Sequence, residues 1–296
     1  MEQEKTLPNH KNKPYGGAWA IEDDAYINAI NDIITTNGES LSNTVPDEFI
    51  DHYKQWFQSS HKIQGISTFD KATCSLGTTE TFDKFYMYNR NRRLRLFKGE
   101  YFYHQMVARK LYKDNWAWMD NEIVPGDVLV FSLPFADTGS YIHGLDKVLE
   151  QCDTHGVPVL IDMAYINLAR GMQVDLSRDC IKVVTTSLSK VFPVQYHRIG
   201  MRLTKDIDDD LMIAYQQNNY VNRFGCGLGI EMMKRFGADH THKTYEVRQQ
   251  QLCDELGIEP SRCVIFGVDY SGKYQEYSRG GTTNRLCFSN VWNKKG

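Results

Sequence analysis

The chain has 296 residues and a mass of 34.2 kDa, which is long enough for one large or two modest domains with a sizeable hydrophobic core. Lysine and arginine together number 34 against 37 aspartates and glutamates, so the formal charge of -3 gives no overall attraction for nucleic acids or anionic membranes. Because 41% of the residues are hydrophobic and 24% are charged, the composition is that of a folded globular protein and argues against disorder.

No part of the sequence approaches the run of about 18 apolar residues that a membrane-spanning helix needs, and residues 1–17 lack the apolar core of a signal peptide. We therefore expect a cytoplasmic protein with no membrane partner. The seven cysteines form an odd set without a C-x-x-C pair, and the histidines show no ligand spacing. The sequence thus predicts neither a disulfide framework nor a metal site, and we expect the cysteines to be buried small apolar side chains.

The first elements expected along the chain are two helices. Residues 19–34 carry apolar side chains among polar ones, and residues 46–57 begin with Pro46 and continue with the i, i+3, i+4, i+7 spacing of a helical stripe. We assign residues 1–60 to an N-terminal arm and helices.

From residue 72 the pattern changes to short apolar runs separated by longer amphipathic segments. The runs fall at residues 72–76, 93–97, 127–133, 157–162, 182–188 and 199–203, with helices expected from Thr79, from about Tyr103 and over 141–154. Strands that alternate with helices predict an α/β fold with a mostly parallel central sheet flanked by helices. We assign residues 61–240 to this large domain.

A shorter α+β unit is expected after it. Helices are predicted over 206–220 and 241–256, and two β-like runs at 262–270 and 284–292 close the chain. Residues 241–256 would connect the two units, so we assign 241–296 to an abbreviated C-terminal small domain.

Two other motifs favour structural interpretations. The run NRNRRLRLFK at 89–98 carries five positive charges, which fits a solvated turn leading into a strand better than a phosphate-binding patch. The motif GCGLG at 225–229 follows no strand and has no acidic residue at the required distance, so it indicates tight helix packing rather than a dinucleotide loop.

Polar groups follow three of the expected strands. Asp162 ends the apolar run VPVLID, at the position where open α/β sheets place ligand-binding groups, although an aspartate there is equally a helix cap. Lys190 follows the next run, among hydroxyls and eight residues before Arg198. Gly77 follows another run and opens a helix, where free backbone N–H groups suit a phosphate. A nucleophilic amine, a phosphate site and a carboxylate that can protonate a ring nitrogen are what pyridoxal phosphate needs.

Three motifs follow one another in the chain: D-x-A-Y, S-x-S-K ending 28 residues after Asp162, and R-I-G. In this order and spacing they resemble the fold-type I pyridoxal phosphate enzymes, in particular the class I/II aminotransferases. The resemblance covers residues 72–205 well and residues 241–256 and 284–290 loosely. It implies pyridoxal 5'-phosphate as cofactor and a homodimer with a shared active site.

The resemblance also implies a role for individual residues. Lys190 would hold the cofactor as a Schiff base and shuttle a proton, Asp162 would pair with the pyridine nitrogen, and Tyr165 would bind the phenolic oxygen. Tyr101 would stack on the ring, with Tyr103 close enough to compete, and Arg285 would clamp the substrate carboxylate. The residues implied around the phosphate are Gly77, Thr78, Thr79, Ser187, Ser189 and Arg198.

Two departures from the family pattern stand out. Where the family has N-P-T-G, this chain has Ala136-Asp137-Thr138-Gly139, so the asparagine that binds the phenolic oxygen is missing. Only 11 residues follow Arg285, so the small domain is shortened. The segment YGGAW at 15–19 is a candidate arm over the site.

The resemblance implies an aminotransferase that moves an amino group between an α-amino acid and a 2-oxo acid. The same residues also suit a lyase, a decarboxylase or another specialised biosynthetic enzyme, since the outcome depends on which Cα bond lies perpendicular to the ring. A non-catalytic sensor with the same fold is a third possibility, which Lys190 argues against.

Overall fold

The structure, a computed structural model, describes residues 13–37, 42–207 and 210–293. Its centre is a seven-stranded sheet with the strand order β2-β9-β8-β6-β5-β3-β4. The strands of this sheet are β2 (Lys71–Ser75), β3 (Arg93–Leu96), β4 (Trp116–Trp118), β5 (Asp127–Ser132), β6 (Val159–Asp162), β8 (Ile181–Ser187) and β9 (Gly200–Thr204). Only β9 runs antiparallel to its neighbours, so the mostly parallel sheet expected from the sequence is confirmed.

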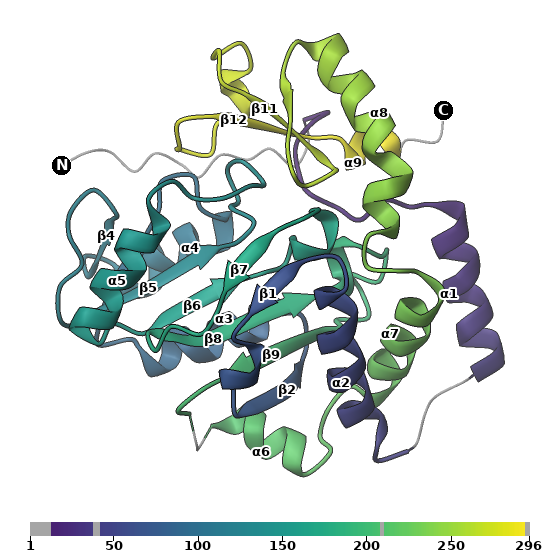
Figure 1. Cartoon of the computed structure of the whole chain (residues 1–296), viewed down its shortest axis with the longest axis horizontal. Coiled ribbons are helices and arrows are strands. Elements are labelled where there is room, and N and C mark those ends of the chain that lie inside the picture. The colour runs from purple at the N-terminus through teal and green to yellow at the C-terminus, as the bar shows by residue number, and fades with distance from the viewer. Residues whose placement is uncertain (1–12, 38–41, 208–209, 294–296) are drawn as a thin grey trace.

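Helices cover both faces of the sheet (Figure 1). Alternate residues of β5 point to opposite faces, so Leu129 and Phe131 pack in one core cluster and Val128 and Val130 in another. The first cluster includes side chains of α1 (Asp24–Asn37), α2 (Val45–Gln58), α5 (Leu145–His155) and α7 (Arg223–Arg235). The second includes side chains of α3 (Thr78–Tyr88) and α4 (Phe102–Val107). β5 is therefore buried on both faces, which explains its uninterrupted apolar sequence.

Several helices differ from their expected bounds because a cap decides where each begins. The first helix starts at Asp24 rather than near residue 19, and the Asp23 carboxylate accepts a bond from the Ala25 amide. α6 (Leu211–Gln217) starts after Asp210, whose side chain caps the Ile213 amide. No helix in the described ranges is both long and apolar enough to cross a bilayer.

The glycine-rich segment is the helix α7, and its glycines allow close packing. A Cβ built on Gly229 would lie 2.8 Å from the Phe49 ring of α2. The seven cysteines are all buried and unpaired by disulfides, as the sequence indicates.

The end of the chain forms a second, three-stranded antiparallel sheet above the first (Figure 1). It consists of β10 (Glu259–Pro260), β11 (Phe266–Asp269) and β12 (Asn284–Cys287), with α8 (His240–Leu256) leading into it and α9 (Ser289–Trp292) following it. A short parallel pair, β1 (Lys62–Gln64) with β7 (Gln173–Asp175), was not expected from the sequence. The division at residues 60 and 240 stays a prediction.

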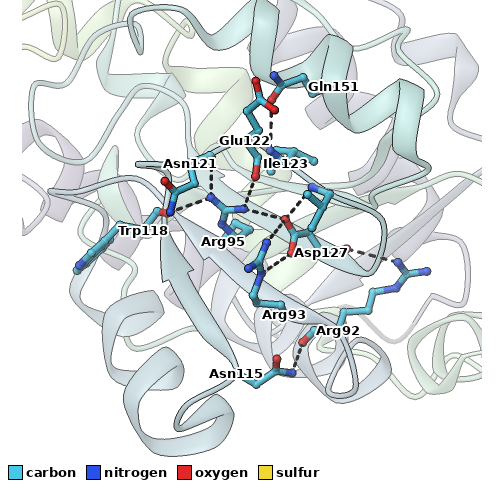
Figure 2. A network of polar contacts seen from close by, with 11 residues as sticks. Arg92, Arg93, Arg95, Asn115, Trp118, Asn121, Glu122, Ile123, Asp127 and Gln151 are labelled. Carbon is cyan, nitrogen blue, oxygen red and sulfur yellow. Dashed lines mark hydrogen bonds and ion pairs between the residues drawn. The ribbon is translucent and has the colours of Figure 1, made fainter. Parts of the chain in front are cut away.

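The basic run before β3 is only partly the solvated turn that we expected. Arg95 is fully buried in β3, and its guanidinium donates to Asp127 Oδ2 at 2.8 Å and to the carbonyl oxygens of three residues (Figure 2). Those residues are Trp118, Asn121 and Glu122. The half-exposed Arg93 binds the same carboxylate at 2.7 Å. Burial acts to raise the pKa of Asp127, but the bonds from Arg93, the Val124 amide and Arg95 hold this pKa below its usual value.

Replacement of Arg95 tests how strongly this buried pair supports the sheet. We expect Arg95→Ala to lower the free energy of unfolding by about 3–5 kcal/mol, because it removes the fully buried partner of the Asp127 carboxylate and the donor to three carbonyl oxygens. Arg93→Ala, the matched control at a half-exposed partner, should lower it by about 1 kcal/mol or less. Urea denaturation measures both free energies of unfolding, and equal losses in the two variants would contradict a special structural role for the buried Arg95.

Candidate active site

The polar groups that follow the strands meet because the strands end together. The register places Asp162 of β6 beside Ser132 of β5 on one side and Thr185 of β8 on the other. Further along the same edge, Ser187 of β8 pairs with Gly200 of β9, which pairs with Ser75 of β2. The carboxyl ends of the parallel strands thus form one continuous polar rim.

Asp162 is buried, and one of its carboxylate oxygens is held by a hydrogen bond. Oδ1 accepts a hydrogen bond from the Ala164 amide at 2.9 Å, and Oδ2 lies 3.7 Å from Nε2 of His104. His104 is fully buried, and its other ring nitrogen, Nδ1, shares a 2.6 Å hydrogen bond with the hydroxyl of Tyr86. Tyr86 therefore sets the orientation of the His104 ring, and His104 lies behind Asp162 with its Nε2 free of hydrogen bonds among the described residues.

Sequence reasoning missed His104. It lies three residues after Tyr101 on α4, so the two side chains share one face of the helix, and their rings make an edge contact at 5.6 Å. The i, i+3 relation to an expected site residue was the only signal available, because a lone histidine on an apolar helix is otherwise a packing residue.

Tyr101 is positioned by the loop before α4. Its amide donates to the buried Glu100 carboxylate at 2.6 Å, and that carboxylate also accepts the Ser132 amide at 2.9 Å. Burial raises the pKa of Tyr101, and the nearby Tyr165 and Asp162 raise it further. Tyr101 and Asp162 thus both lie beside His104. Tyr103 is more exposed and its hydroxyl bonds to Asp83 instead.

Lys190 follows the next strand of the rim. It ends a short 3₁₀ turn, Leu188–Lys190, directly after β8, and its Nζ lies 5.9 Å from the centre of the Tyr165 ring. The amine donates a 2.7 Å hydrogen bond to the carbonyl oxygen of Ala18 and lies 5.9 Å from the Trp19 ring. The segment at 15–19 therefore covers Lys190. No contact joins Lys190 directly to Asp162 among the described interactions, and Tyr165 lies between the two in sequence and near both.

Contacts with the C-terminal elements hold the arm over Lys190. The Cys287 amide donates to Tyr15 O at 2.9 Å, and the Trp19 amide donates to Ser289 Oγ at 3.1 Å. The side chain of Asn293 bonds to both Ala20 O and the Glu22 amide. The two ends of the chain are thus joined beside the rim.

A cradle suited to an anion lies at the other end of the rim. Gly77 precedes α3 with φ +74°, and a Cβ on it would lie 2.4 Å from Nη2 of Arg198. The hydroxyls of Ser187 and Ser189, which precede Arg198 in the chain, share a 2.6 Å hydrogen bond. Thr78 and Thr79 form the first turn of α3. Free backbone N–H groups at a helix start and a guanidinium together favour a phosphate.

Arg285 of β12 reaches the rim from the small sheet. Its guanidinium carbon lies 4.0 Å from the centre of the Phe266 ring and 5.7 Å from that of Tyr165. It is almost fully buried, and Nη1 donates to the carbonyl oxygen of Ala136. The backbone of Ala136 therefore positions the arginine, while its methyl side chain offers no hydrogen bond.

The model of the family "Aminotransferase class I and II" matches residues 112–262, just over half of the chain. The chain belongs to this family. The resemblance drawn from D-x-A-Y and S-x-S-K is thereby confirmed, and the cofactor expected from the sequence is that of the family, pyridoxal phosphate.

Several solved structures share the fold of this chain. A pyridoxal phosphate-bound C-S lyase from Staphylococcus hominis aligns with a TM-score of 0.67 at 12% identity, covering 94% of this chain and 88% of the other. A tyrosine aminotransferase from Leishmania infantum aligns with 0.66 at 11% identity, covering 97% and 91%. An aromatic aminotransferase from Pyrococcus horikoshii OT3 aligns with 0.66 at 12%, covering 94% and 91%. No curated protein matches the sequence. At these identities the alignments establish the fold, and the roles of individual site residues stay predictions.

The cradle can be tested at Gly77 with a matched glycine elsewhere. Gly77 and Gly126 both have positive φ, but a Cβ at Gly126 meets nothing within 4 Å. We expect both alanine variants to lose about 1–3 kcal/mol of unfolding stability from backbone strain. Only Gly77→Ala should also weaken pyridoxal phosphate binding, by about tenfold or more, because its Cβ displaces the Arg198 guanidinium. Fluorescence titration measures the affinities for pyridoxal phosphate, and equal affinities in the two variants would contradict the assignment of Gly77 to the phosphate cradle.

Proposed function

We propose that the chain is a pyridoxal phosphate-dependent aminotransferase that moves an amino group between an α-amino acid and a 2-oxo acid. The observation that carries this proposal is the position of Tyr165, which lies against both Lys190 and Arg285 at 5.9 and 5.7 Å. An amine and a guanidinium that suits a carboxylate thus lie near the same aromatic ring, which supports the proposal.

The donor groups of the site fit the cofactor. Gly77 leaves the space beside Arg198 that a side chain would fill, which suits a phosphate. Asp162 is buried and backed by His104, whose Nε2 makes no hydrogen bond among the described residues. A carboxylate in this setting suits a protonated ring nitrogen, and the half-buried Tyr101 supplies an aromatic face beside it.

Each residue of the proposed site would have a separate role in the reaction. The bound cofactor supplies electron withdrawal from the amino acid. Asp162 would keep the ring nitrogen protonated, and Tyr165 would donate to the phenolic oxygen. Lys190 would first hold the cofactor and then, once released, move a proton between the Cα of the amino acid and the cofactor carbon. Arg285 would orient the α-carboxylate. The Ala18 carbonyl of the arm accepts a hydrogen bond from the same amine and would orient it.

The choice between transamination and elimination rests on geometry that Ala136 affects. The family asparagine is absent here, so Tyr165 would be the donor to the phenolic oxygen from this part of the site. A lyase uses the same residues, and the shared fold with a C-S lyase makes it the second candidate.

Lys190 provides the direct test. Purified protein loaded with pyridoxal phosphate should absorb at about 410–430 nm, and borohydride should fix the cofactor to Lys190. Lys190→Ala should lose both the band and the covalent label, while Lys182→Ala, a lysine at the opposite end of β8, should keep them. A 2-oxo acid released together with the amine form of the cofactor supports the aminotransferase. Release of ammonia or carbon dioxide instead identifies a lyase, and a silent spectrum with every amino acid would contradict both.

We also propose that the chain is a homodimer that joins beside the phosphate cradle. Three large apolar side chains are exposed around Arg198: Leu76 (49%), Tyr196 (85%) and Tyr220 (77%). Leu76 and Tyr220 line the same surface pocket as Arg198. An exposed aromatic cluster beside a functional site is typical of a subunit interface.

Sedimentation equilibrium tests the interface. The wild-type chain should sediment as a dimer, and Tyr220→Asp should raise the dimer dissociation constant about tenfold or more. Tyr270→Asp, an exposed tyrosine after β11 in the small sheet, should leave it unchanged. A wild-type monomer, or equal effects of the two variants, would contradict this interface.

A further inference from the structure

Two arginines of the small sheet, the buried Arg285 and the half-buried Arg279, differ in their pairing from Arg95 and Arg202, the other two buried arginines of the described ranges. Arg285 lies in β12, and Arg279 lies in the loop before it, after the short 3₁₀ turn Gln275–Tyr277. Within the described ranges, neither forms an ion pair with a carboxylate, and the Nε of each is buried without a hydrogen-bond partner.

Arg95 and Arg202, the other two buried arginines of the described ranges, each bind an aspartate. Arg95 binds Asp127 at 2.8 Å, and Arg202 binds Asp210 with Nη2 to Oδ1 at 2.9 Å. Burial of an unpaired charge is unfavourable, so the fold compensates its internal guanidinium groups with aspartates. Arg285 is the one fully buried arginine of the described ranges without a carboxylate, and the half-buried Arg279 of the preceding loop has none either, which is the arrangement of a site that takes its anions from a ligand.

Arg279 faces the candidate active site. Its carbonyl oxygen accepts a 3.2 Å bond from Gln105 Nε2, which also donates to Glu100 O, so its backbone is fixed to the loop that carries Tyr101. Its positive charge acts to lower the pKa of Tyr101. Burial and the nearby positive charge of Arg285 lower the pKa of Arg279 to about 10, while Tyr165 acts in the opposite direction. The backbone bond thus fixes Arg279 beside the Tyr101 loop, and its charge acts on Tyr101 and Tyr165 and is acted on by Arg285.

The nearest acidic residue does not neutralise the pair. Asp137 is buried, its Oδ2 accepts the Thr283 hydroxyl at 2.8 Å, and its Oδ1 has no hydrogen-bond partner among the described residues. A Cβ on Gly281 would lie 2.2 Å from Oδ2, so this carboxylate is enclosed by the loop. Burial raises the pKa of Asp137. At most one negative charge thus faces two positive charges.

We propose that Arg279 is a substrate-binding residue that selects amino acids with a second anionic group on the side chain. The proposal rests on the proposed function, in which Arg285 takes the α-carboxylate. The second group is a carboxylate or a phosphate, because both match a guanidinium in charge and bidentate geometry.

Binding of unreactive acids tests the site without turnover. The cofactor-loaded protein is melted in the presence of succinate or propionate, which differ by one carboxylate. Succinate should raise the midpoint more than propionate in the wild type, because a ligand that binds the folded state stabilises it according to its affinity. The difference should disappear in Arg279→Gln, should persist in part in Arg279→Lys, and should be unchanged in Arg90→Gln, an exposed arginine of the turn after α3.

Spectral titration with amino acids then defines the substrate class. The wild type should bind L-aspartate, L-glutamate or O-phospho-L-serine about 10- to 100-fold more tightly than L-asparagine and L-glutamine. Arg279→Gln should reduce this preference to within about threefold, whereas Arg285→Gln should weaken acidic and neutral amino acids alike. The tightest acidic ligand identifies the second anion as carboxylate or phosphate.

The outcomes separate this proposal from the function on which it rests. Equal binding of acidic and neutral amino acids by the wild type, or a preference that survives Arg279→Gln, overturns the role of Arg279 and leaves the aminotransferase standing. If no amino acid changes the spectrum while succinate still stabilises through Arg279, the proposed reaction is wrong and the anion site remains.

Discussion

The alignment of β5, β6 and β8 is the constraint on which the rest of the site depends. These strands are parallel and in register, so Ser132, Asp162 and Thr185 lie side by side at one edge of the sheet. Because β9 returns antiparallel from Gly200, its first residue meets the end of β8 and continues the rim toward β2. Groups that are tens of residues apart in the chain thus reach one surface through the pairing of the strands.

The polar groups within the core support this alignment in two different ways. At the amino end of the sheet, Arg95 ties β3 to β5 and to the carbonyl oxygens of the loop at 118–122 through a buried ion pair (Figure 2). At the carboxyl end, Glu100 binds the amides of Tyr101 and Ser132 and fixes the loop before α4. The first network pairs its guanidinium groups with the Asp127 carboxylate, whereas Arg279 and Arg285 at the rim form no ion pair with a carboxylate among the described residues. A paired buried charge suits a structural role, and a guanidinium without an internal carboxylate suits an anionic ligand.

The short C-terminal unit reaches the rim by joining both ends of the chain. β12 carries Arg285 to Tyr165, and residues 287–293 hold the arm whose Ala18 carbonyl binds Lys190. A small sheet of three strands therefore covers the site from above, with the arm as its extension. The N-terminal segment thus takes part in covering Lys190.

The sequence by itself determined the alternation of strands and helices, because burial on both faces of a parallel sheet demands unbroken apolar runs, and it determined the family through the spacing of Asp162, Lys190 and Arg198. Helix starts were less predictable, since caps such as Asp23 and Asp210 compete with apolar periodicity. The buried state of Arg95, the place of His104 behind Asp162 and the approach of Arg279 to Arg285 were decided only by the tertiary structure. Each of these features depends on a partner that is remote in the chain, or on the lack of one. Local apolar periodicity predicts neither a long-range contact nor its absence.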